Sequence, residues 1–393
     1  MWSFKTDAAA LRKALRPHQF IHPNQSPVEW HTVLTESESG VSITTTNHTL
    51  IFYSKLEVKV ESDLDDYLTV AFPLLRVMAY LKDMGSEVFT VFWSESRIEF
   101  RSIGGFIAFE TGDPNDAMID FAMDTQEGSF EVSPVKLQTA MRFVRPAIST
   151  DLMRPTLITV LLERSSLDKD KVCAVATDGH LLGWTQFPMK NPSGDFRFIT
   201  DGLAAKFITD YFPVQDDKLA GVVTFMNTVT EVEPMKVSWG ENRSWFEHNG
   251  CILMVVNPDG EYPKYRNVIP ETGDNVIFIK RDKWVPLLKQ MLATMGDSID
   301  FGVTFDLGVI DPGRITMTRS SVDAKGKGRI TMPGTYQGVA FVINFNIKYL
   351  LAVIEAMPGQ GIRIYLTGRE TAAVVIPETA PDDYLYLVMP MRD

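Results

Sequence analysis

The chain has 393 residues, of which 45% are hydrophobic and 22% are charged. These proportions are those of a folded globular protein, and the length exceeds what one ordinary core accommodates, so two or three domains are expected. The formal net charge of −12 and a pI near 5.1 argue against a protein whose whole surface is basic and binds nucleic acid. A basic face on part of the surface is compatible with this average.

Cysteine usage and hydropathy exclude further classes of protein. Cys173 and Cys251 are the only cysteines, and each lies in an apolar run typical of a strand. We therefore expect two small buried thiols in a reducing cytosol, without a disulfide framework or a cysteine-based zinc site. The N-terminal segment carries Asp7 and lacks the apolar core of a signal peptide. No stretch of about 18 uncharged apolar residues occurs, so no membrane span is expected.

One pattern recurs three times along the chain. In each copy a short alternation typical of a strand leads into apolar residues spaced four apart, as on one face of a helix. The three copies are marked by Phe4, Thr6, Leu11 and Leu15, by Phe130, Val132, Leu137 and Met141, and by Ile277, Ile279, Trp284 and Leu288.

A second helical segment follows each of these helices by roughly 60 residues, as a repeat of fixed period requires. These segments are 72–84, 201–212 and 346–357, and strands are expected at 87–93, 98–109, 220–225, 315–319 and 362–376. Turn-forming residues cluster at 124–129 and 257–275. We therefore predict domains at 1–127, 128–273 and 274–393, with coincidental α+β patterning as the alternative.

Positive charge is concentrated in the predicted helical segments. The segments 5–16, 72–84, 132–146, 201–212, 280–295 and 345–357 hold 15 Lys or Arg against 6 Asp or Glu, a net of +9, which leaves −21 for the rest of the chain. Cationic side chains that contact phosphates give sequence-independent affinity for DNA, although for any single residue a solvated helix face is the alternative. The candidates to face DNA are Lys13, Arg16, Arg76, Lys82, Lys136, Arg142, Arg145, Lys206, Lys283, Lys289 and Lys348.

Four segments carry a resemblance to a known family. Residues 175–180 read VATDGH, residues 261–270 read EYPKYRNVIP, residues 345–351 read FNIKYLL and residues 388–392 read VMPMR. The first is similar to the ATDGHRLA signature, and the second to the FPDYRRVLP segment, of the bacterial DNA polymerase III beta subunit. All four occur in that family's order and near its spacing, mainly in the second and third predicted domains.

The resemblance implies an α+β fold of three repeated DNA-clamp domains, each with two helices packed on antiparallel sheets. A head-to-tail homodimer of such chains closes into a ring with helices lining the hole. The implied function is that of a non-enzymatic sliding clamp in the bacterial cytosol, associated with the nucleoid and without cofactor or metal. Its implied partners are double-stranded DNA of any sequence, the replicative DNA polymerase, the clamp loader and other proteins with clamp-binding motifs, and no membrane.

The resemblance also implies a groove at the seam between the second and third domains, which captures short peptides that end in hydrophobic side chains. Carried over position by position, the groove comprises Leu157, Thr177, Gly179, His180, Leu182, Pro263, Asn267, Val268, Asn346, Tyr349, Val388, Met389, Pro390 and Met391.

Some positions depart from the family pattern. Leu181 and Asn267 stand where the family usually has arginine, so acidic residues of a partner peptide are expected to matter less here. Residues 154–157 (RPTL) replace aromatic residues that touch DNA in many members, which puts that contact in doubt, and Asp393 replaces a terminal apolar residue.

A hydrolase or nucleotide-binding enzyme on a repeated α+β scaffold is the alternative function. Asp178 and His180 could form an acid–base pair, but no serine nucleophile motif accompanies them. Residues 325–329 (KGKGR) lack the phosphate-loop pattern and predict a basic hairpin tip. Irregular spacing favours one polar loop over a metal site for His18, His22, Glu29 and His31.

Overall fold

The computed structural model describes residues 2–23, 30–37, 40–62, 68–117, 126–212, 233–296, 301–311, 313–320, 327–340 and 342–392. The chain divides into two compact units. Unit 1 consists of Met1–Gln138, Met189–Phe196 and Leu203–Pro258, and unit 2 of Thr139–Pro188, Arg197–Gly202 and Asp259–Asp393.

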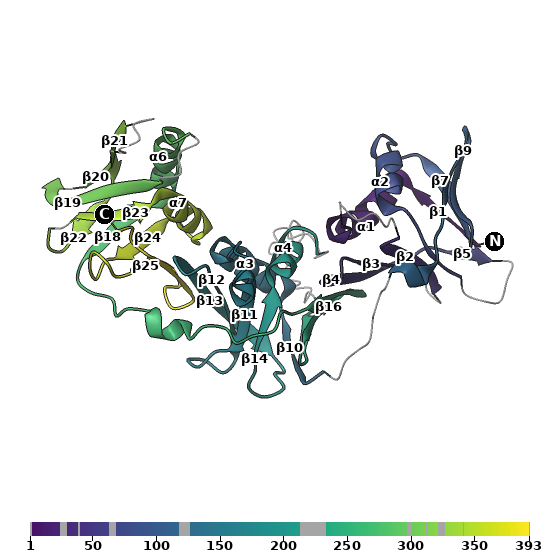
Figure 1. Ribbon diagram of the computed structural model, residues 1–393, viewed down its shortest axis with the longest axis horizontal. Helices are drawn as coiled ribbons and strands as arrows, with labels where there is room; N and C mark the ends of the chain where they lie inside the picture. The colour runs from purple at the N-terminus through teal and green to yellow at the C-terminus, as the bar shows by residue number, and fades with distance from the viewer. Residues whose placement is uncertain are drawn as a thin grey trace, which may run out of the picture. The chain divides into compact units, whose positions relative to one another are not determined.

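Each predicted helical segment contains a helix. The helices of the described residues are α1 (Ala8–Ile21), α2 (Leu74–Lys82), α3 (Pro134–Val144), α4 (Gly202–Asp210), α6 (Arg281–Ala293) and α7 (Ile347–Ala356). Short 3₁₀ turns occur at η1 (Pro114–Ala117), η2 (Arg145–Ala147), η3 (Pro155–Ile158) and η4 (Tyr265–Val268). In unit 1 α1 packs against α2, and in unit 2 α6 packs against α7 (Figure 1). The apolar pairs that marked each repeat, such as Leu11 with Leu15, are buried.

Helix α1 is longer than predicted. It begins after Asp7, whose carboxylate accepts a hydrogen bond from the backbone N–H of Ala10 at 2.8 Å. The sequence predicted an end before Pro17, but the helix continues to Ile21. A proline inside a helix removes one backbone hydrogen bond. Here the turn that follows buries His18 and Ile21, and this burial offsets the lost bond.

Unit 1 holds two antiparallel sheets. The first has the order β5-β1-β7-β8-β9, from β5 (Val60–Ser62), β1 (Trp2–Asp7), β7 (Val88–Ser94), β8 (Arg97–Ser102) and β9 (Gly105–Glu110). The second runs β6-β2-β3-β4-β17-β16-β15-β10. Its strands are β6 (Thr69–Ala71), β2 (Thr32–Ser37), β3 (Gly40–Thr46), β4 (Leu50–Leu56), β17 (Cys251–Val256), β16 (Arg243–His248), β15 (Met235–Trp239) and β10 (Gly128–Val132).

Unit 2 also holds two antiparallel sheets. One sheet runs β14-β11-β12-β13-β26-β25-β24-β18-β22, from β14 (Arg197–Asp201), β11 (Thr159–Arg164), β12 (Lys171–Thr177), β13 (Leu181–Lys190), β26 (Tyr384–Val388), β25 (Ala373–Pro377), β24 (Gly361–Tyr365), β18 (Val276–Lys280) and β22 (Thr335–Gln337). The other runs β23-β19-β20-β21, from β23 (Val342–Asn346), β19 (Gly302–Asp311), β20 (Arg314–Ser320) and β21 (Lys327–Pro333).

The strand order confirms the threefold repeat. One four-stranded pattern appears as β6-β2-β3-β4, β14-β11-β12-β13 and β23-β19-β20-β21, and another as β1-β7-β8-β9, β10-β15-β16-β17 and β18-β24-β25-β26. Successive repeats are joined by antiparallel pairing of β4 with β17 and of β13 with β26. Each sheet of the middle repeat therefore continues into a flanking repeat, which is why the two compact units divide that repeat. The domain boundaries at 127/128 and 273/274 stay predictions.

Two predicted strands are hairpins. The segment 98–109 contains β8 and β9, and the segment 362–376 contains β24 and β25. The first reversal uses Gly105, whose φ of 140° lies in a region that favours glycine. Strand β20 pairs with β21, whereas the predicted strand at 220–225, the basic tip at 325–326 and Asp393 lie outside the described residues.

The cysteine prediction is confirmed for both residues. Cys173 in β12 and Cys251 in β17 are buried free thiols, and burial raises the pKa of each to about 11. Among the described helices, none combines the length and the hydropathy required to cross a membrane.

The prediction that the N-terminal histidines share one loop was wrong for His18. This residue lies in α1, where its Nδ1 is 3.0 Å from the hydroxyl of Thr45 and its Nε2 is 2.8 Å from that of Ser54. The sequence missed this placement because it predicted the helix to end too early. The ring of His22 contacts that of His31 edge-on. Glu29 lies outside the described residues, among which no group of three side chains is arranged to hold a metal ion.

We expect acidification to destabilise unit 1 through His18. Burial lowers the pKa of His18 to about 3, against 6.5 for the exposed group. The unfolded chain therefore binds the additional proton between these values, so the stability is complete above pH 6.5 and falls below it. From pH 7 to pH 5 the free energy of unfolding should fall by about 2 kcal/mol from this group.

Urea denaturation of the wild type and of His18→Gln at pH 7 and pH 5 measures this effect, because the variant lacks the titrating group. Between pH 7 and pH 5 the free energy of unfolding of the variant should fall by about 2 kcal/mol less than that of the wild type. His180→Gln, which replaces an exposed histidine, should retain the wild-type dependence. An unchanged dependence in His18→Gln would contradict the assignment.

Candidate functional site

The Thr-Asp-Gly motif forms the turn between β12 and β13, as its residue types predicted. One carboxylate oxygen of Asp178 accepts hydrogen bonds from the backbone N–H groups of His180 and Leu181, at 2.8 and 2.7 Å. The hydroxyl of Thr177 donates to the carbonyl of Leu181 at 2.7 Å. Gly179 adopts a φ of 94°, where other residues are strained. The turn is therefore held in one conformation by its own side chains.

Asp178 also ties this turn to the start of α7. Its second oxygen accepts a hydrogen bond from the hydroxyl of Tyr349 at 2.8 Å, and burial together with this carboxylate raises the pKa of Tyr349 to about 12. The ring of His180 stacks on that of Tyr349, with centroids 6.4 Å apart. Asn346 caps α7, because its side chain accepts a hydrogen bond from the N–H of Lys348 at 2.9 Å. Asp178 thus serves as a structural acceptor in these contacts.

The C-terminal segment passes the same turn. Strand β26 pairs with β13, so that Leu181 is opposite Val388. Beyond the strand, the N–H of Met389 donates to the carbonyl of His180, and the N–H of Met391 donates to the carbonyl of Asn344, both at 2.8 Å. Two methionines that flank Pro390 are therefore held beside the turn by their backbone.

Residues 259–268 form the neighbouring part of the site. Tyr262 and Tyr265 are 3% and 4% exposed and pack in one cluster with Leu182. The hydroxyl of Tyr262 donates to the carbonyl of Val175 in β12 at 3.4 Å. This anchoring leaves Val268, 60% exposed, on the outer side of η4.

The predicted groove residues fall into three groups. Hydrogen bonds and ring contacts bring together Thr177, Gly179, His180, Asn346, Tyr349, Met389, Pro390 and Met391. Pro263, Asn267 and Val268 lie exposed on the neighbouring segment. Leu157, Leu182 and Val388 are only 8%, 4% and 0% exposed, because strand alternation and η3 turn these side chains inward. The exposed apolar surface is supplied mainly by Val268 and Met389.

A pocket that the sequence did not reveal lies beside this segment. It has a volume of about 280 Å³ and is lined by Glu163, Arg197, Lys264, Tyr265, Arg266 and Asn267. The carboxylate of Glu163 accepts hydrogen bonds from the hydroxyl of Tyr265 and from Nη2 of Arg266, both at 2.6 Å. Its other oxygen is 3.3 Å from Nε of Arg197. In the sequence, the adjacent Tyr265 and Arg266 are the only local indication of this pocket, and they do not indicate that Glu163 lies beside them.

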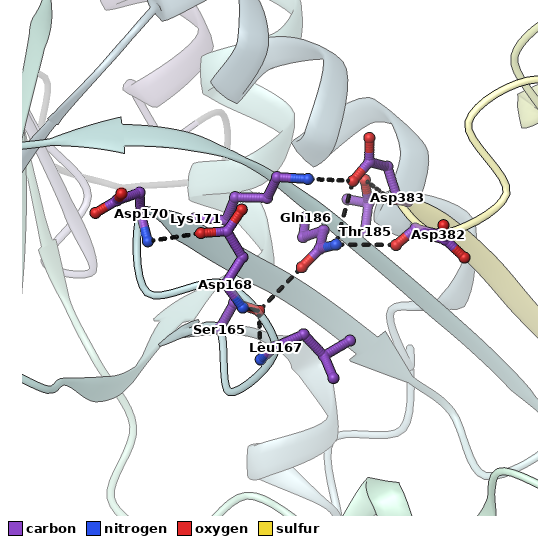
Figure 2. A network of polar contacts seen from close by, with 9 residues as sticks. All are labelled: Ser165, Leu167, Asp168, Asp170, Lys171, Thr185, Gln186, Asp382 and Asp383. Atoms are coloured by element: carbon purple, nitrogen blue, oxygen red, sulfur yellow. Dashed lines mark hydrogen bonds and ion pairs between the residues drawn. The ribbon is translucent and has the colours of Figure 1, made fainter.

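A polar network fixes the far end of the β13–β26 pair (Figure 2). Lys171 forms an ion pair of 2.7 Å with Asp383, and its hydrogen bond to Asp383 raises the pKa of Lys171. The amide of Gln186 donates to the carbonyl of Asp382 at 2.9 Å and accepts from the hydroxyl of Ser165 at 2.9 Å. Since a shift of one residue would turn every side chain to the opposite face, these contacts fix the position of Met389 beside the β12–β13 turn.

The predicted basic residues lie at the surface. Ten of the eleven are exposed and Arg145 is half-buried. Within the observed helix bounds there are twelve Lys or Arg and three Asp or Glu. Lys289 is paired with Glu355 at 2.6 Å, which weakens its attraction for a further anion. Lys13 and Lys136 form no ion pair with other described residues, so their ammonium groups are more available to bind a phosphate group.

Comparison with known proteins agrees with this architecture. A family model described as the C-terminal domain of the DNA polymerase III beta subunit matches residues 266–392. The beta sliding clamp of Caulobacter vibrioides is 25% identical over 285 residues, which cover 70% of this chain and 69% of that protein. The beta sliding clamp of Escherichia coli K12 is 25% identical over 227 residues, or 57% and 55% of the two chains.

Solved structures share the fold over the whole chain. The DNA polymerase III subunit beta of Pseudomonas aeruginosa has a TM-score of 0.83 at 19% identity, with both chains covered completely. The beta subunit of Thermotoga maritima gives 0.82 at 18% identity with the same coverage. The repeated topology, the order of the four motifs and these relatives agree: residues 266–392 match the C-terminal domain of the DNA polymerase III beta subunit, and the whole chain has the fold of the DNA sliding clamps.

Proposed function

We propose that this protein is a DNA sliding clamp that encircles duplex DNA and tethers the replicative polymerase and other clamp-binding proteins, conferring processivity. The observation that carries the proposal is the threefold repeat that ends in two complementary strand edges. The family is non-catalytic, so we assign no enzymatic activity. We place the three domains at 1–127, 128–273 and 274–393.

Ring closure follows from the way in which the repeats are joined. Within the chain, β4 pairs with β17 and β13 pairs with β26. Strand β21 is equivalent to β4 and β13, and strand β9 is equivalent to β17 and β26. In the described part of the chain, β21 and β9 each lie at a sheet edge and do not take part in such a junction. Pairing β21 of one subunit with β9 of another repeats the same junction and gives a head-to-tail homodimer. Strand β9 exposes Phe106 and Ile107, and an exposed apolar edge of this kind favours pairing.

The dimer predicts a mass in solution of twice the 44.2 kDa of the chain. Ile107→Asp should shift the protein to monomer at micromolar concentration, because it places a charge in the apolar strand junction. Sedimentation analysis measures the mass. Leu167→Asp, at an exposed position in the β11–β12 turn, is the control and should remain dimeric. A monomeric wild type would contradict ring closure.

The helices supply the surface that faces DNA in this proposal. Their net charge is +9 within the observed bounds, in a chain whose total is −12. Cationic helices attract phosphates, while the acidic remainder discourages DNA from wrapping around the outside. A ring holds DNA by topology, so affinity for the phosphates need only be weak.

Retention on DNA should therefore depend on closure of the DNA circle. After loading by a clamp loader, the dimer should stay on closed circular DNA at salt concentrations that abolish direct binding, and linearisation should release it. Gel filtration of loaded complexes before and after cutting measures retention. Equal release from closed circles and from linear DNA would refute the ring mechanism.

The contribution of the helices can be tested separately. Lys13→Glu combined with Lys136→Glu should weaken direct duplex binding and lower its salt dependence, with each lost phosphate contact reducing the slope by about 1. Lys5→Glu combined with Lys280→Glu changes the net charge equally on strands β1 and β18 and is the matched control. Equal effects of the two pairs would contradict the assignment of DNA contacts to the helices.

We propose that the peptide groove lies where the β12–β13 turn, the start of α7, the C-terminal segment and η4 come together. Its ligands are short segments of the polymerase, the clamp loader and other clamp-binding proteins that end in hydrophobic side chains. Association with the nucleoid in the cytosol follows from this role.

Met389→Ser should weaken the binding of such a peptide about tenfold, because it removes one of the exposed apolar side chains at the site. Fluorescence anisotropy with a labelled peptide measures this loss. Leu167→Ser replaces a leucine that is 79% exposed in the β11–β12 turn, at the opposite end of β12 from Thr177, and should leave affinity unchanged. Truncation after Val388 should abolish binding and preserve the dimer, whereas binding by the truncated protein would show that the groove is misplaced.

A further inference from the structure

The pocket beside η4 has the chemistry of an anion site. Three cationic side chains, Arg197, Lys264 and Arg266, line it together with one carboxylate, that of Glu163. Glu163 is 6% exposed, whereas the side chains of Arg197 and Arg266 are 40% and 50% exposed. The negative charge is therefore buried behind the positive ones, and the surface offered to a ligand is cationic.

The guanidinium groups retain donors after they have bound Glu163. A guanidinium has five N–H groups. Arg266 directs Nη2 to Glu163 and Nε to the hydroxyl of Tyr265, and no hydrogen bond to another described residue engages its Nη1. Arg197 donates from Nη2 to the carbonyl of Tyr262 at 3.2 Å and places Nη1 3.9 Å from Glu261, which is 79% exposed. Lys264 forms no ion pair with the described residues. Donors that point to one small volume suit a carboxylate.

The pocket adjoins the proposed groove along the backbone. Asn267 lines the pocket, and the next residue, Val268, presents the exposed apolar side chain of η4. Consecutive Cα atoms are about 3.8 Å apart. A peptide that packs a hydrophobic residue on Val268 can therefore reach the pocket with a residue a few positions away.

We propose that this pocket binds an acidic side chain of the partner peptide, through Arg266 and Lys264 with Asn267 and Arg197 beside them. The inference rests on the proposed groove. It revises the expectation drawn from Leu181 and Asn267, because Leu181 is 1% exposed and paired with Val388 inside the sheet. The guanidinium groups of this contact come from Arg266 on η4 and Arg197 on β14.

The experiment uses the full-length protein and labelled peptides that end in two large hydrophobic residues. One Glu is placed in turn at each of the preceding four positions, and each peptide is paired with its Gln counterpart. At one or more positions the change of Glu to Gln should weaken binding about tenfold, as expected for loss of a charge-assisted hydrogen bond. Added salt should reduce this difference.

Two variants assign the effect to the pocket. In Arg266→Gln the ratio of the two affinities should fall below threefold. Because this change also removes a partner of the buried Glu163, Lys264→Gln provides a second variant that leaves the Glu163 contacts intact, and it should reduce the ratio at least twofold. Lys280→Gln, at an exposed lysine of β18, is the control and should retain the full ratio.

The outcomes separate this inference from the proposed function. Equal affinities for all Glu and Gln peptides overturn the inference and leave the groove standing, whereas failure of every peptide to bind overturns both. If the ratio of the affinities for the Glu and Gln peptides persists in Arg266→Gln and Lys264→Gln, the acidic side chain of the peptide binds outside this pocket, which also overturns the inference. If these two variants lose duplex affinity as strongly as the Lys13 and Lys136 pair, the pocket holds a DNA phosphate instead.

Discussion

Antiparallel pairing between the edge strands of successive repeats is the interaction on which the rest of the structure depends. A sheet that ends in an unpaired strand exposes a row of backbone donors and acceptors, and in this chain β4 and β13 satisfy theirs on β17 and β26. The junctions extend each sheet of the middle repeat into a neighbour, so no repeat is an isolated body. Among the described strands they also leave one edge of each kind, at β9 and β21. The proposed pairing of β9 with β21 of a second copy satisfies both edges.

The candidate site is a consequence of the second junction. Because β26 adds to β13, the segment after Val388 reaches the β12–β13 turn, where Met389 bonds to the carbonyl of His180. Asp178 contributes to the same arrangement, since it holds its own turn with one oxygen and Tyr349 with the other. The polar network around Gln186 fixes the register at the opposite end (Figure 2). The proposed peptide groove therefore depends on the same backbone contacts as the assembly of the sheet.

Local patterns predicted the repeated frame better than they predicted the surface of the site. Leu11 with Leu15 and Trp284 with Leu288 identified helices because spacing alone decides which face is buried. The Thr-Asp-Gly turn was predicted for a similar reason, since its hydrogen bonds are local. Spacing did not show that Leu157, Leu182 and Val388 point inward, because their exposure depends on strands far apart in sequence. The grouping of Glu163 with Arg197 and Arg266 likewise results from folding and leaves no signal in the sequence.

The small exposed apolar area at the groove has a consequence for how such a protein holds its partners. Complete burial of one large apolar side chain contributes about 1.5–3 kcal/mol, so the two terminal hydrophobic residues of a peptide supply about 3–6 kcal/mol, against the roughly 8 kcal/mol of a micromolar complex. Backbone hydrogen bonds and charged contacts must supply the remainder. A moderate affinity is nevertheless sufficient on a ring, because a partner that is bound to the same DNA rebinds at a high effective concentration. The threefold frame thus permits a groove that exchanges its ligands while topology keeps the assembly on DNA.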